Sequence, residues 1–359
     1  MDKKNIAVLI IITLLVVVIA MLLVQRREAA TSDDALGALF FRDLEQKLDD
    51  VAVVEIVQGK DRVTLQRDGE TWRIKEKGGY AADFDKLKSL VLSIANLLSV
   101  EGKTSKADQY DKLGVTDPAA EDATHPGVTL KDANGTILAA LVIGDAHDSD
   151  DGVKKQLYVR RLNDTQAWLV EGKVEVLTDA AAWLRKDRIA DIFRSRMKSL
   201  DITLPDGAHY LVTKTSRDEK GFQYSPMPRN FKIRSQARLD DMSAALENVV
   251  PDDAIVADSF QFPATGVGHN EYRTFDGVVV KAALLQKDNK WYVKYEVAFD
   301  LSVAGTPSKS GGAVGESEKV KQEAESLAQN LKGWVFVLPE AKANLMIKKI
   351  SDVLVPSTL

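Results

Sequence analysis

The sequence predicts an α+β protein in which an N-terminal transmembrane helix precedes two tandem repeats, each an antiparallel β-meander with packed helices. Three observations lead to this fold class. An uninterrupted apolar run lies near the N-terminus, strand-like runs are followed by a segment of helical periodicity, and the same order of patterns recurs in the second half of the chain.

The apolar run extends from Ile6 to Val24 and contains no charged residue. As a helix it would be about 28 Å long, close to the roughly 30 Å of a bilayer core. A cleaved signal peptide is the alternative, because Ala29 and Ala30 follow the run, but its apolar region is usually only about 7 to 15 residues long. We expect a retained anchor that binds the chain to the membrane.

The charges on the two sides of this run are balanced, so they do not set its orientation. Residues 1–5 form a very short tail, and long domains are translocated largely regardless of charge. We therefore expect a single-pass protein of a bacterial inner membrane with residues 1–5 in the cytoplasm, residues 6–24 in the bilayer and the rest in the periplasm.

Composition limits the classes of partner. The chain has no cysteine, which excludes disulfide bonds and cysteine-based metal sites within it. Its net charge is −5, with acidic and basic residues interspersed. This pattern predicts neither nucleic-acid binding nor a polybasic lipid-binding patch. Protein and glycan partners remain.

The first repeat is expected over residues 51–195, after a juxtamembrane helical segment over 25–50 that serves as a stalk or docks on the repeat. Strand-like runs at 51–57, 62–66 and 71–75 are separated by turn residues. Residues 83–98 then have helical periodicity, and Asp83 is suited to the N-cap.

The second repeat is expected over residues 196–359. Each half has a predicted hairpin, around Asn134-Gly135 in the first and around Asp288-Asn289 in the second. Each half then closes with a tryptophan-bearing strand followed by a helix, which the sequence predicts at 174–184 and 339–347. The common order indicates a duplication.

Several short motifs resemble those of the bacterial domain of unknown function DUF4340. They are Gly69-Glu70-Thr71-Trp72-Arg73-Ile74, Ala82-Asp83, Tyr110-Asp111-Lys112-Leu113-Gly114-Val115 before Pro118, Ile143-Gly144, and Tyr158-Val159-Arg160. The resemblance implies an N-terminally anchored envelope protein that acts beside an ABC-type transport system, including systems similar to gliding-motility exporters. It implies no catalytic residue. The second half lacks a clear Tyr-x-x-Leu-Gly equivalent.

One acidic cluster is the only metal-like pattern that we identify. Hard cations such as Ca²⁺ bind several oxygen ligands around a tight turn, yet the spacing does not match an EF-hand, so a solvated hairpin loop is the competing interpretation. No histidine pair has zinc-ligand spacing, and no Gly-x-Ser-x-Gly nucleophile elbow occurs. We predict no catalytic, cofactor or metal site, with these weak candidates for a cation: Asp145, His147, Asp148, Asp150 and Asp151.

A basic segment interleaved with apolar residues provides the candidate partner-binding residues. It is either an amphipathic helix with a solvated cationic face or a docking face for an acidic partner or for anionic headgroups. The glycine- and serine-rich stretch Thr306 to Glu318 is a second candidate for partner contact. The basic candidates are Arg185, Lys186, Arg188, Arg194, Arg196 and Lys198.

Four tryptophans distinguish two hypotheses for the function. The first is a non-catalytic, membrane-anchored periplasmic accessory protein that binds subunits of an ABC-type transporter. The alternative is an extracytoplasmic protein that binds or modifies a glycan or the cell wall, which would need indole rings exposed on one face. Core packing is the simpler interpretation of Trp72, Trp168, Trp291 and Trp334, because all four lie in strand-like runs.

Overall fold

The protein is mostly β-sheet, which corrects the expected α+β class. The computed structural model describes residues 36–149, 152–303 and 314–357, and these form three antiparallel sheets with few helices. The described chain divides into two compact units, one made of 36–76 and 81–183 and the other of 77–80 and 184–357. The division falls near Leu184, whereas the sequence predicts it after residue 195.

The first unit is built on a nine-stranded sheet with the order β4-β3-β2-β1-β6-β7-β8-β9-β5. Branched and aromatic residues alternate with polar ones along several of these strands, as expected for a pleated surface with a buried face. The strands are β1 (Val53–Gln58), β2 (Asp61–Asp68), β3 (Thr71–Ile74), β4 (Tyr80–Ala81), β5 (Leu98–Gly102), β6 (Gly127–Lys131), β7 (Ile137–Asp148), β8 (Lys155–Arg161) and β9 (Ala167–Glu171).

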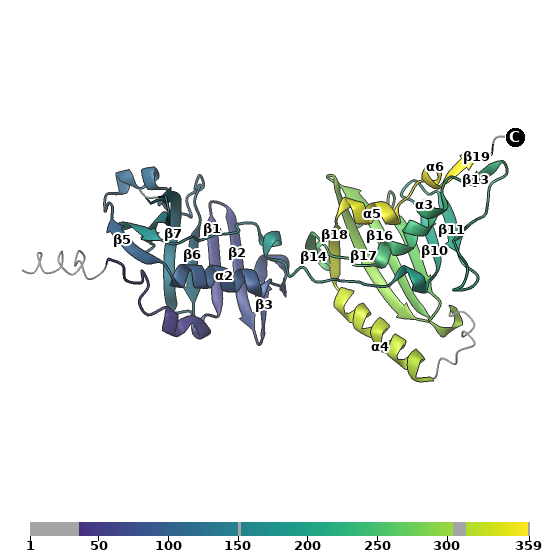
Figure 1. Cartoon of the computed structure of the whole chain (residues 1–359), viewed down its shortest axis with the longest axis horizontal. Coiled ribbons are helices and arrows are strands. Elements are labelled where there is room, and N and C mark those ends of the chain that lie inside the picture. Colours follow the sequence, from purple (N-terminus) through teal and green to yellow (C-terminus); the bar gives the residue numbers. More distant parts are fainter. Residues whose placement is uncertain (1–35, 150–151, 304–313, 358–359) are drawn as a thin grey trace, which may run out of the picture. The chain divides into compact units, whose positions relative to one another are not determined.

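One helix, α2 (Phe84–Ala95), lies across a face of this sheet (Figure 1). Asp83 caps it as the sequence predicts, since its carboxylate accepts hydrogen bonds from the backbone N–H groups of Asp85 and Lys86 at 3.1 and 3.2 Å. Its buried side chains include Leu87, Leu90 and Ile94, spaced to form one apolar stripe. The helix therefore closes the first face.

The opposite face is closed by the connection between β5 and β6, residues 103–126. Within it, Tyr110 and Val115 pack with Val142 of β7 and Ala167 of β9. Leu141 and Val142 are both fully buried although adjacent strand residues point to opposite faces. We call residues 110–115 the covering segment, because over β7 and β9 they bury the face that α2 leaves open.

Two groups hold the covering segment against the sheet. The buried guanidinium of Arg160 donates to the carbonyl oxygen of Val115 at 2.9 Å and lies 4.7 Å from the centre of the Tyr110 ring. The Tyr110 hydroxyl donates to the carbonyl oxygen of Thr165 at 2.5 Å. Gly144 allows the covering segment to lie close to β7. A Cβ at this position would collide with the Leu113 carbonyl oxygen and would lie 2.8 Å from the Val115 side chain.

The second unit repeats the strand order of the first. Its eight-stranded sheet has the order β12-β11-β10-β15-β16-β17-β18-β14, which matches β3-β2-β1-β6-β7-β8-β9-β5 position by position. The strands are β10 (Met197–Thr203), β11 (His209–Thr213), β12 (Gln223–Ser225), β14 (Asp253–Val256), β15 (Gly268–Thr274), β16 (Val278–Lys287), β17 (Lys290–Phe299) and β18 (Trp334–Leu338).

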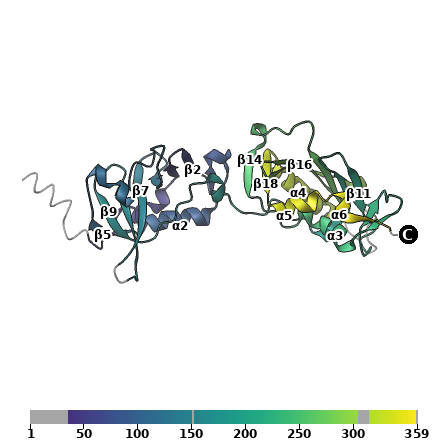
Figure 2. The ribbon, with the colours of Figure 1, turned by 90° about the horizontal axis from the view of Figure 1, so that it is seen from above.

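One face of this second sheet carries most of the helices. The buried residues of α3 (Gln236–Asp241), of the 3₁₀ turn Met242–Leu246 and of α5 (Glu340–Met346) supply the apolar layer. The helix α4 (Val314–Leu331) contacts β17. Figures 1 and 2 place α3, α5 and α6 (Ile350–Val353) beside this sheet, and β13 (Phe231–Ile233) pairs with β19 (Leu354–Pro356) near the end of the chain.

Two predicted helices are not helical, and local contacts explain both. In the described part of the segment expected to be helical over 25–50, the backbone N–H of Phe40 bonds to the Leu97 carbonyl oxygen. The chain therefore runs along β5 before a 3₁₀ turn at Glu45–Asp50. Within 174–184, only Ala180–Trp183 form a 3₁₀ turn. The Trp183 indole N–H bonds back to the Leu177 carbonyl oxygen, which fixes a buried ring instead of a helical repeat.

The basic segment is also not a helix. It runs as a loop and a 3₁₀ turn at Arg194–Arg196 into β10. Glu247 holds this turn, because its carboxylate accepts from the backbone N–H of Arg194 at 2.5 Å and from the Arg194 guanidinium at 3.0 Å. Burial raises the pKa of Glu247, and the hydrogen bonds from Arg194 outweigh this effect and lower it below its ordinary value of 4.5.

The expected membrane-spanning helix over residues 6–24 lies outside the described residues. Within 36–149, 152–303 and 314–357, none of the helices combines the length and the apolar character that crossing a bilayer requires.

We predict that Gly144→Ala destabilises the first unit by about 2 kcal/mol or more, because the new methyl group would push the covering segment off the sheet. Gly102→Ala is the matched control, since a Cβ there would lie 3.4 Å from its nearest neighbour. Thermal or urea unfolding of the two variants measures the difference. Equal stability of the two would show that the close approach at Gly144 is not a constraint.

We also predict an acid-sensitive contribution from Glu247. A carboxyl with a lowered pKa stabilises the fold above its ordinary value of 4.5 and loses this contribution as the pH falls through the folded pKa. Glu247→Gln should therefore cost about 1 to 2 kcal/mol at neutral pH and much less in acid. Urea unfolding of both proteins across this range is the measurement, and a constant difference would contradict the assignment.

Candidate functional site

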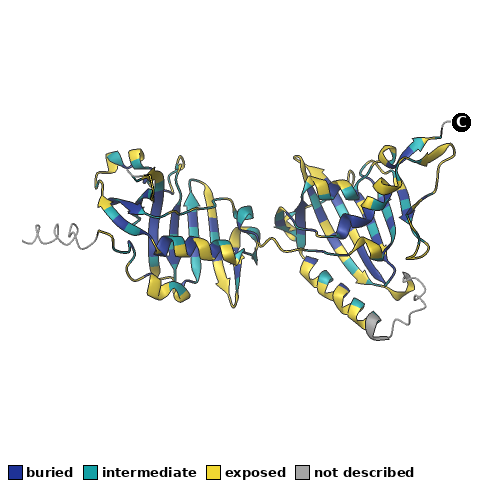
Figure 3. Cartoon of the chain, viewed as in Figure 1, coloured by how far each residue is buried: buried dark blue, intermediate teal, exposed yellow. Residues whose placement is uncertain are grey.

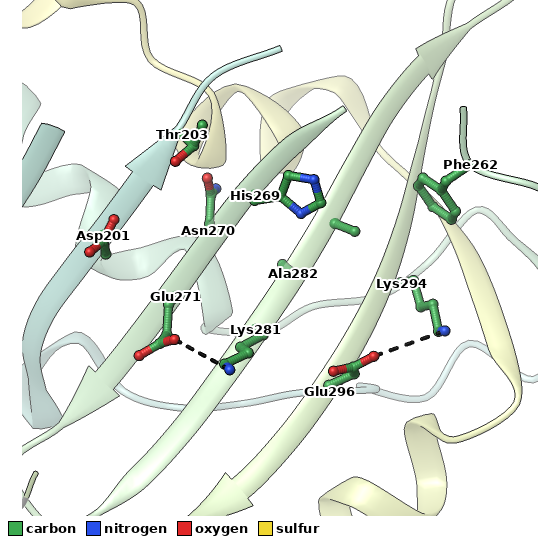
Figure 4. Close-up of a pocket in the computed structure, with 11 residues that line it drawn as sticks. Asp201, Thr203, Phe262, His269, Asn270, Glu271, Lys281, Ala282, Lys294 and Glu296 are labelled. Carbon is green, nitrogen blue, oxygen red and sulfur yellow. Dashed lines mark ion pairs between the residues drawn. The ribbon is translucent and has the colours of Figure 1, made fainter. Parts of the chain in front are cut away.

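A concave surface lies on the second sheet, opposite the helices α3 and α5. It encloses about 520 Å³ and is formed by β10, β15, β16 and β17 together with Phe262. Figure 4 shows polar side chains from these neighbouring strands along one face. We call this surface the groove; its lining residues are Asp201, Thr203, Phe262, His269, Asn270, Glu271, Lys281, Ala282, Ala283, Lys294 and Glu296.

The groove is open because its cover is short. In the first unit the connection between β5 and β6 runs from 103 to 126 and carries the covering segment. Its counterpart between β14 and β15 runs only from 257 to 267 and brings Phe260 and Phe262 to one side. The outer face of β16 consequently keeps Lys281 exposed and Ala283 half-buried. Figure 3 shows this alternation of buried and exposed residues along the strands.

Charged side chains form a row across the strands of the groove. The register places Asp201 opposite Glu271, Glu271 opposite Lys281 and Lys281 opposite Glu296. Two carboxylates directly opposite one another on neighbouring strands repel. Their own partners reduce this cost, since Asp201 contacts the His209 ring nitrogen Nε2 at 2.6 Å and Glu271 pairs with Arg273 and Lys281 at 2.5 and 3.7 Å.

The second row of the groove is less acidic. Thr203 lies opposite His269, His269 opposite Ala283, and Ala283 opposite Lys294. Ala283 is the smallest member of this row, so the floor of the groove is lowest on β16. Small and polar side chains flanked by opposite charges form a surface that suits a polar, extended ligand.

An aromatic wall borders one side of the groove. The rings of Phe260 and Tyr292 stack with their centres 4.6 Å apart, and Phe262 meets Phe260 edge to face at 5.2 Å. All three side chains are partly exposed. They give the groove one apolar border.

The structure does not assemble the acidic candidates into a metal centre. Asp145 contacts the Nε2 atom of His125 at 3.0 Å, and Asp148 pairs with Lys155 at 2.7 Å. The lysine contact lowers the pKa of Asp148. His147 lies 5.8 Å from the Tyr158 ring, whereas Asp150 and Asp151 fall outside the described residues. Among the residues described, no three histidine, aspartate or glutamate side chains are grouped to hold a metal.

Most of the basic candidates are bound within their own unit. Arg185 pairs with Asp187, Arg188 with Asp191, and Lys186 donates to the carbonyl oxygens of Pro251 and Asp252. Lys198 lies at the start of β10.

Arg194 and Arg196 have more extensive contacts than the other candidates. Arg194 bonds to Glu247, as described above. Arg196 bonds to Asp276 at 2.9 Å and to Glu323 of α4 at 2.7 and 2.9 Å. Burial lowers the pKa of Arg196, but these two carboxylates outweigh it and raise the pKa above its ordinary value. The cationic groups of this segment therefore fix the fold and are not gathered on an open face.

The tryptophans mostly pack inside the two units. Trp72 and Trp291 are buried, Trp168 lies edge-on to Phe40, and Trp334 lies edge-on to Tyr80. The stretch Thr306 to Glu318 lies largely outside the described residues.

Sequence reasoning missed the groove because it missed a strand. The pattern that pairs β16 with β17 is visible around Asp288-Asn289, but β15 was not expected, since its alternation of His269, Glu271 and Arg273 with Asn270 and Tyr272 is mostly polar. The period of two in this stretch is the signal that could have revealed it.

The comparisons with known proteins give one match. A family model described as domain of unknown function DUF4340 matches residues 72–264, which is more than half of the chain. A comparison with curated proteins finds no match. The matched range begins in β3 and ends in the loop before β15, and it contains the covering segment together with Gly144 and Arg160. The chain belongs to the DUF4340 family.

Proposed function

We propose that this protein is a non-catalytic, extracytoplasmic accessory component of an ABC-type transport system, and that the groove of the second unit binds an extended segment of a transporter subunit. The observation that carries the proposal is the open face formed by β10, β15, β16 and β17. The same strand order with a longer connection is covered in the first unit, so the open face follows from one shortened loop.

The chemistry of the groove favours a binding role over an acid–base role. Its charged groups are paired with opposite charges, as with Glu271 between Arg273 and Lys281. A partner segment would exchange these exposed pairs for pairs of its own, which costs little because exposed ion pairs contribute only about 0 to 1 kcal/mol. The facing carboxylates of Asp201 and Glu271 favour a partner segment that carries a lysine or arginine.

The proposed location rests on the sequence alone. The apolar run from Ile6 to Val24 has the composition and length for insertion into a membrane, and the family resemblance implies an envelope protein beside a transporter. The transporter subunit would then be reached from the periplasmic side.

Glycan binding is the second candidate, and one observation favours it. Phe262 borders the groove and could stack on a sugar ring. The burial of most indole rings counts against a stacking surface built from tryptophan. Soluble cell-wall fragments that shift the intrinsic fluorescence of the protein, with loss of the shift in Phe262→Ala, would favour this candidate.

We predict that Ala283→Trp reduces recovery of transporter subunits at least about tenfold when the full-length protein is purified from its native membrane. The indole would fill the lowest part of the groove, and an unfilled pocket of this kind is what an interface anchor requires. Gln286→Trp is the matched control. Gln286 lies on the same strand and is exposed, but its side chain leaves the opposite face of the strand from that of Ala283. Mass spectrometry of the recovered proteins is the measurement.

A second variant tests the anchor separately. A chain without residues 1–27 should leave the membrane fraction and lose the transporter subunits. Recovery of the protein alone in every preparation, including the unaltered one, would reject the accessory role. Equal recovery with Ala283→Trp would reject the groove but keep the role.

A further inference from the structure

An uninterrupted basic stretch lies in the second unit, outside the candidate segment that the sequence singled out. Between Glu219 and Asp240 the chain has no acidic residue and five basic ones. Lys348 and Lys349 add two more before α6. The net charge of −5 for the whole chain conceals this local excess.

The fold brings these residues to one end of the second unit. β13 pairs with β19, and the backbone N–H of Arg234 bonds to the Val353 carbonyl oxygen at 2.7 Å. The helices α3 and α6 contact each other, and the Lys348 carbonyl oxygen accepts the hydroxyl of Tyr210 at 2.6 Å. Figures 1 and 2 both place α3 and α6 at the end that carries the C-terminus.

The cationic groups at this end form no ion pair with the part of the chain that the structure describes. Within the described residues no carboxylate lies within ion-pair distance of them, in contrast to Arg194 and Arg196. Two acidic side chains in these elements bond to backbone groups, Asp352 to the N–H of Lys349 and Asp240 to the N–H of Phe222. We call the following residues the basic tip: Arg229, Lys232, Arg234, Arg238, Lys348 and Lys349.

Two apolar side chains are exposed among these charges. Met227 and Phe231 have exposed fractions of 43% and 40%, although residues of this type are usually buried. They flank the tight segment that contains Pro228 and Asn230, whose carbonyl oxygen accepts the backbone N–H of Ser357 at 2.7 Å. The exposed apolar groups are therefore held by the backbone and not by loose chain.

We propose that the basic tip docks on an anionic phospholipid surface, with Met227 and Phe231 entering the headgroup region. Clusters of four to eight lysines and arginines bind anionic lipid, each charge contributing about a factor of five to the equilibrium. Apolar side chains interleaved with cations add burial at the acyl boundary. A lipid surface fits both observations, because anionic headgroups bind the cations and the acyl boundary takes up the two apolar side chains.

This proposal revises the expectation that the chain has no lipid-binding patch, and it is independent of the groove. The tip residues lie on β13 and α3, beside β13 and just before α6, whereas the groove is lined by β10, β15, β16 and β17. Loss of one surface should leave the other intact.

The absence of cysteine allows a direct test with the full-length chain. Met227→Cys, labelled with an environment-sensitive fluorophore, would be reconstituted into vesicles of phosphatidylcholine alone or mixed with phosphatidylglycerol, each with a lipid-bound quencher. We expect quenching at position 227 only with phosphatidylglycerol. Substituting Arg229→Gln, Lys232→Gln, Arg234→Gln and Arg238→Gln together should lower the docked-to-undocked ratio at least about tenfold.

Matched controls separate docking from general charge effects. The label at Gln286→Cys should not be quenched, and the substitutions Lys287→Gln, Lys290→Gln, Lys319→Gln and Lys321→Gln should leave the signal at 227 unchanged. Unaltered thermal unfolding would show that each variant is folded. Lack of quenching at 227 in both lipids would overturn the proposal. So would quenching that the four tip substitutions do not reduce, and recovery of an acidic protein instead would assign the tip to that partner.

Discussion

Arg160 is buried against main-chain carbonyl groups, and the arrangement of the first unit depends on this contact. A guanidinium removed from water must have its N–H groups satisfied, since an unpaired buried charge is costly. Its donors reach the carbonyl oxygens of Val115 and Asp164, and its face lies over Tyr110. Moving the covering segment would leave these donors unsatisfied, so the segment and β8 are fixed together.

The second unit has the same strand order without this contact, and its outer face is consequently different. In place of a covering segment it has Phe260 and Phe262 at one side, and polar residues such as Glu271 and Lys281 occupy the exposed positions. A sheet face without cover must be polar to remain in water. The charged row across β10, β15, β16 and β17 is therefore a consequence of the shorter loop, whether or not it also serves the proposed binding. The direct opposition of Asp201 and Glu271 goes beyond this requirement. Two like charges on neighbouring strands destabilise the sheet, and a solvated face does not require them to lie opposite each other.

Local signals in the sequence predicted the local structure well. Asp83 and the apolar spacing after it gave the cap and face of α2, and Asn134-Gly135 gave a hairpin turn in which Gly135 has a φ of +83°. Features that depend on contacts between residues far apart in the sequence could not be predicted from such local signals. The segment around Trp183 has helical spacing, but a hydrogen bond from its indole and burial of the ring decided its path. Strand β15 was not predicted because it contains no hydrophobic run. A strand whose outer face is polar does not require one.

The ion-pair partners of the basic candidate residues also could not be predicted from local sequence. Arg194 and Arg196 looked available because their partners, Glu247, Asp276 and Glu323, are far away in the sequence. The fold brings these acids to them, and the segment becomes a structural connection. Around Phe231 the reverse occurs. The residues just before helix α6 add two further lysines, and the carboxylate of Asp352 bonds to the backbone. Two segments of similar basic composition thus acquire different roles, and the acids that the fold supplies to each decide which one remains open to a partner.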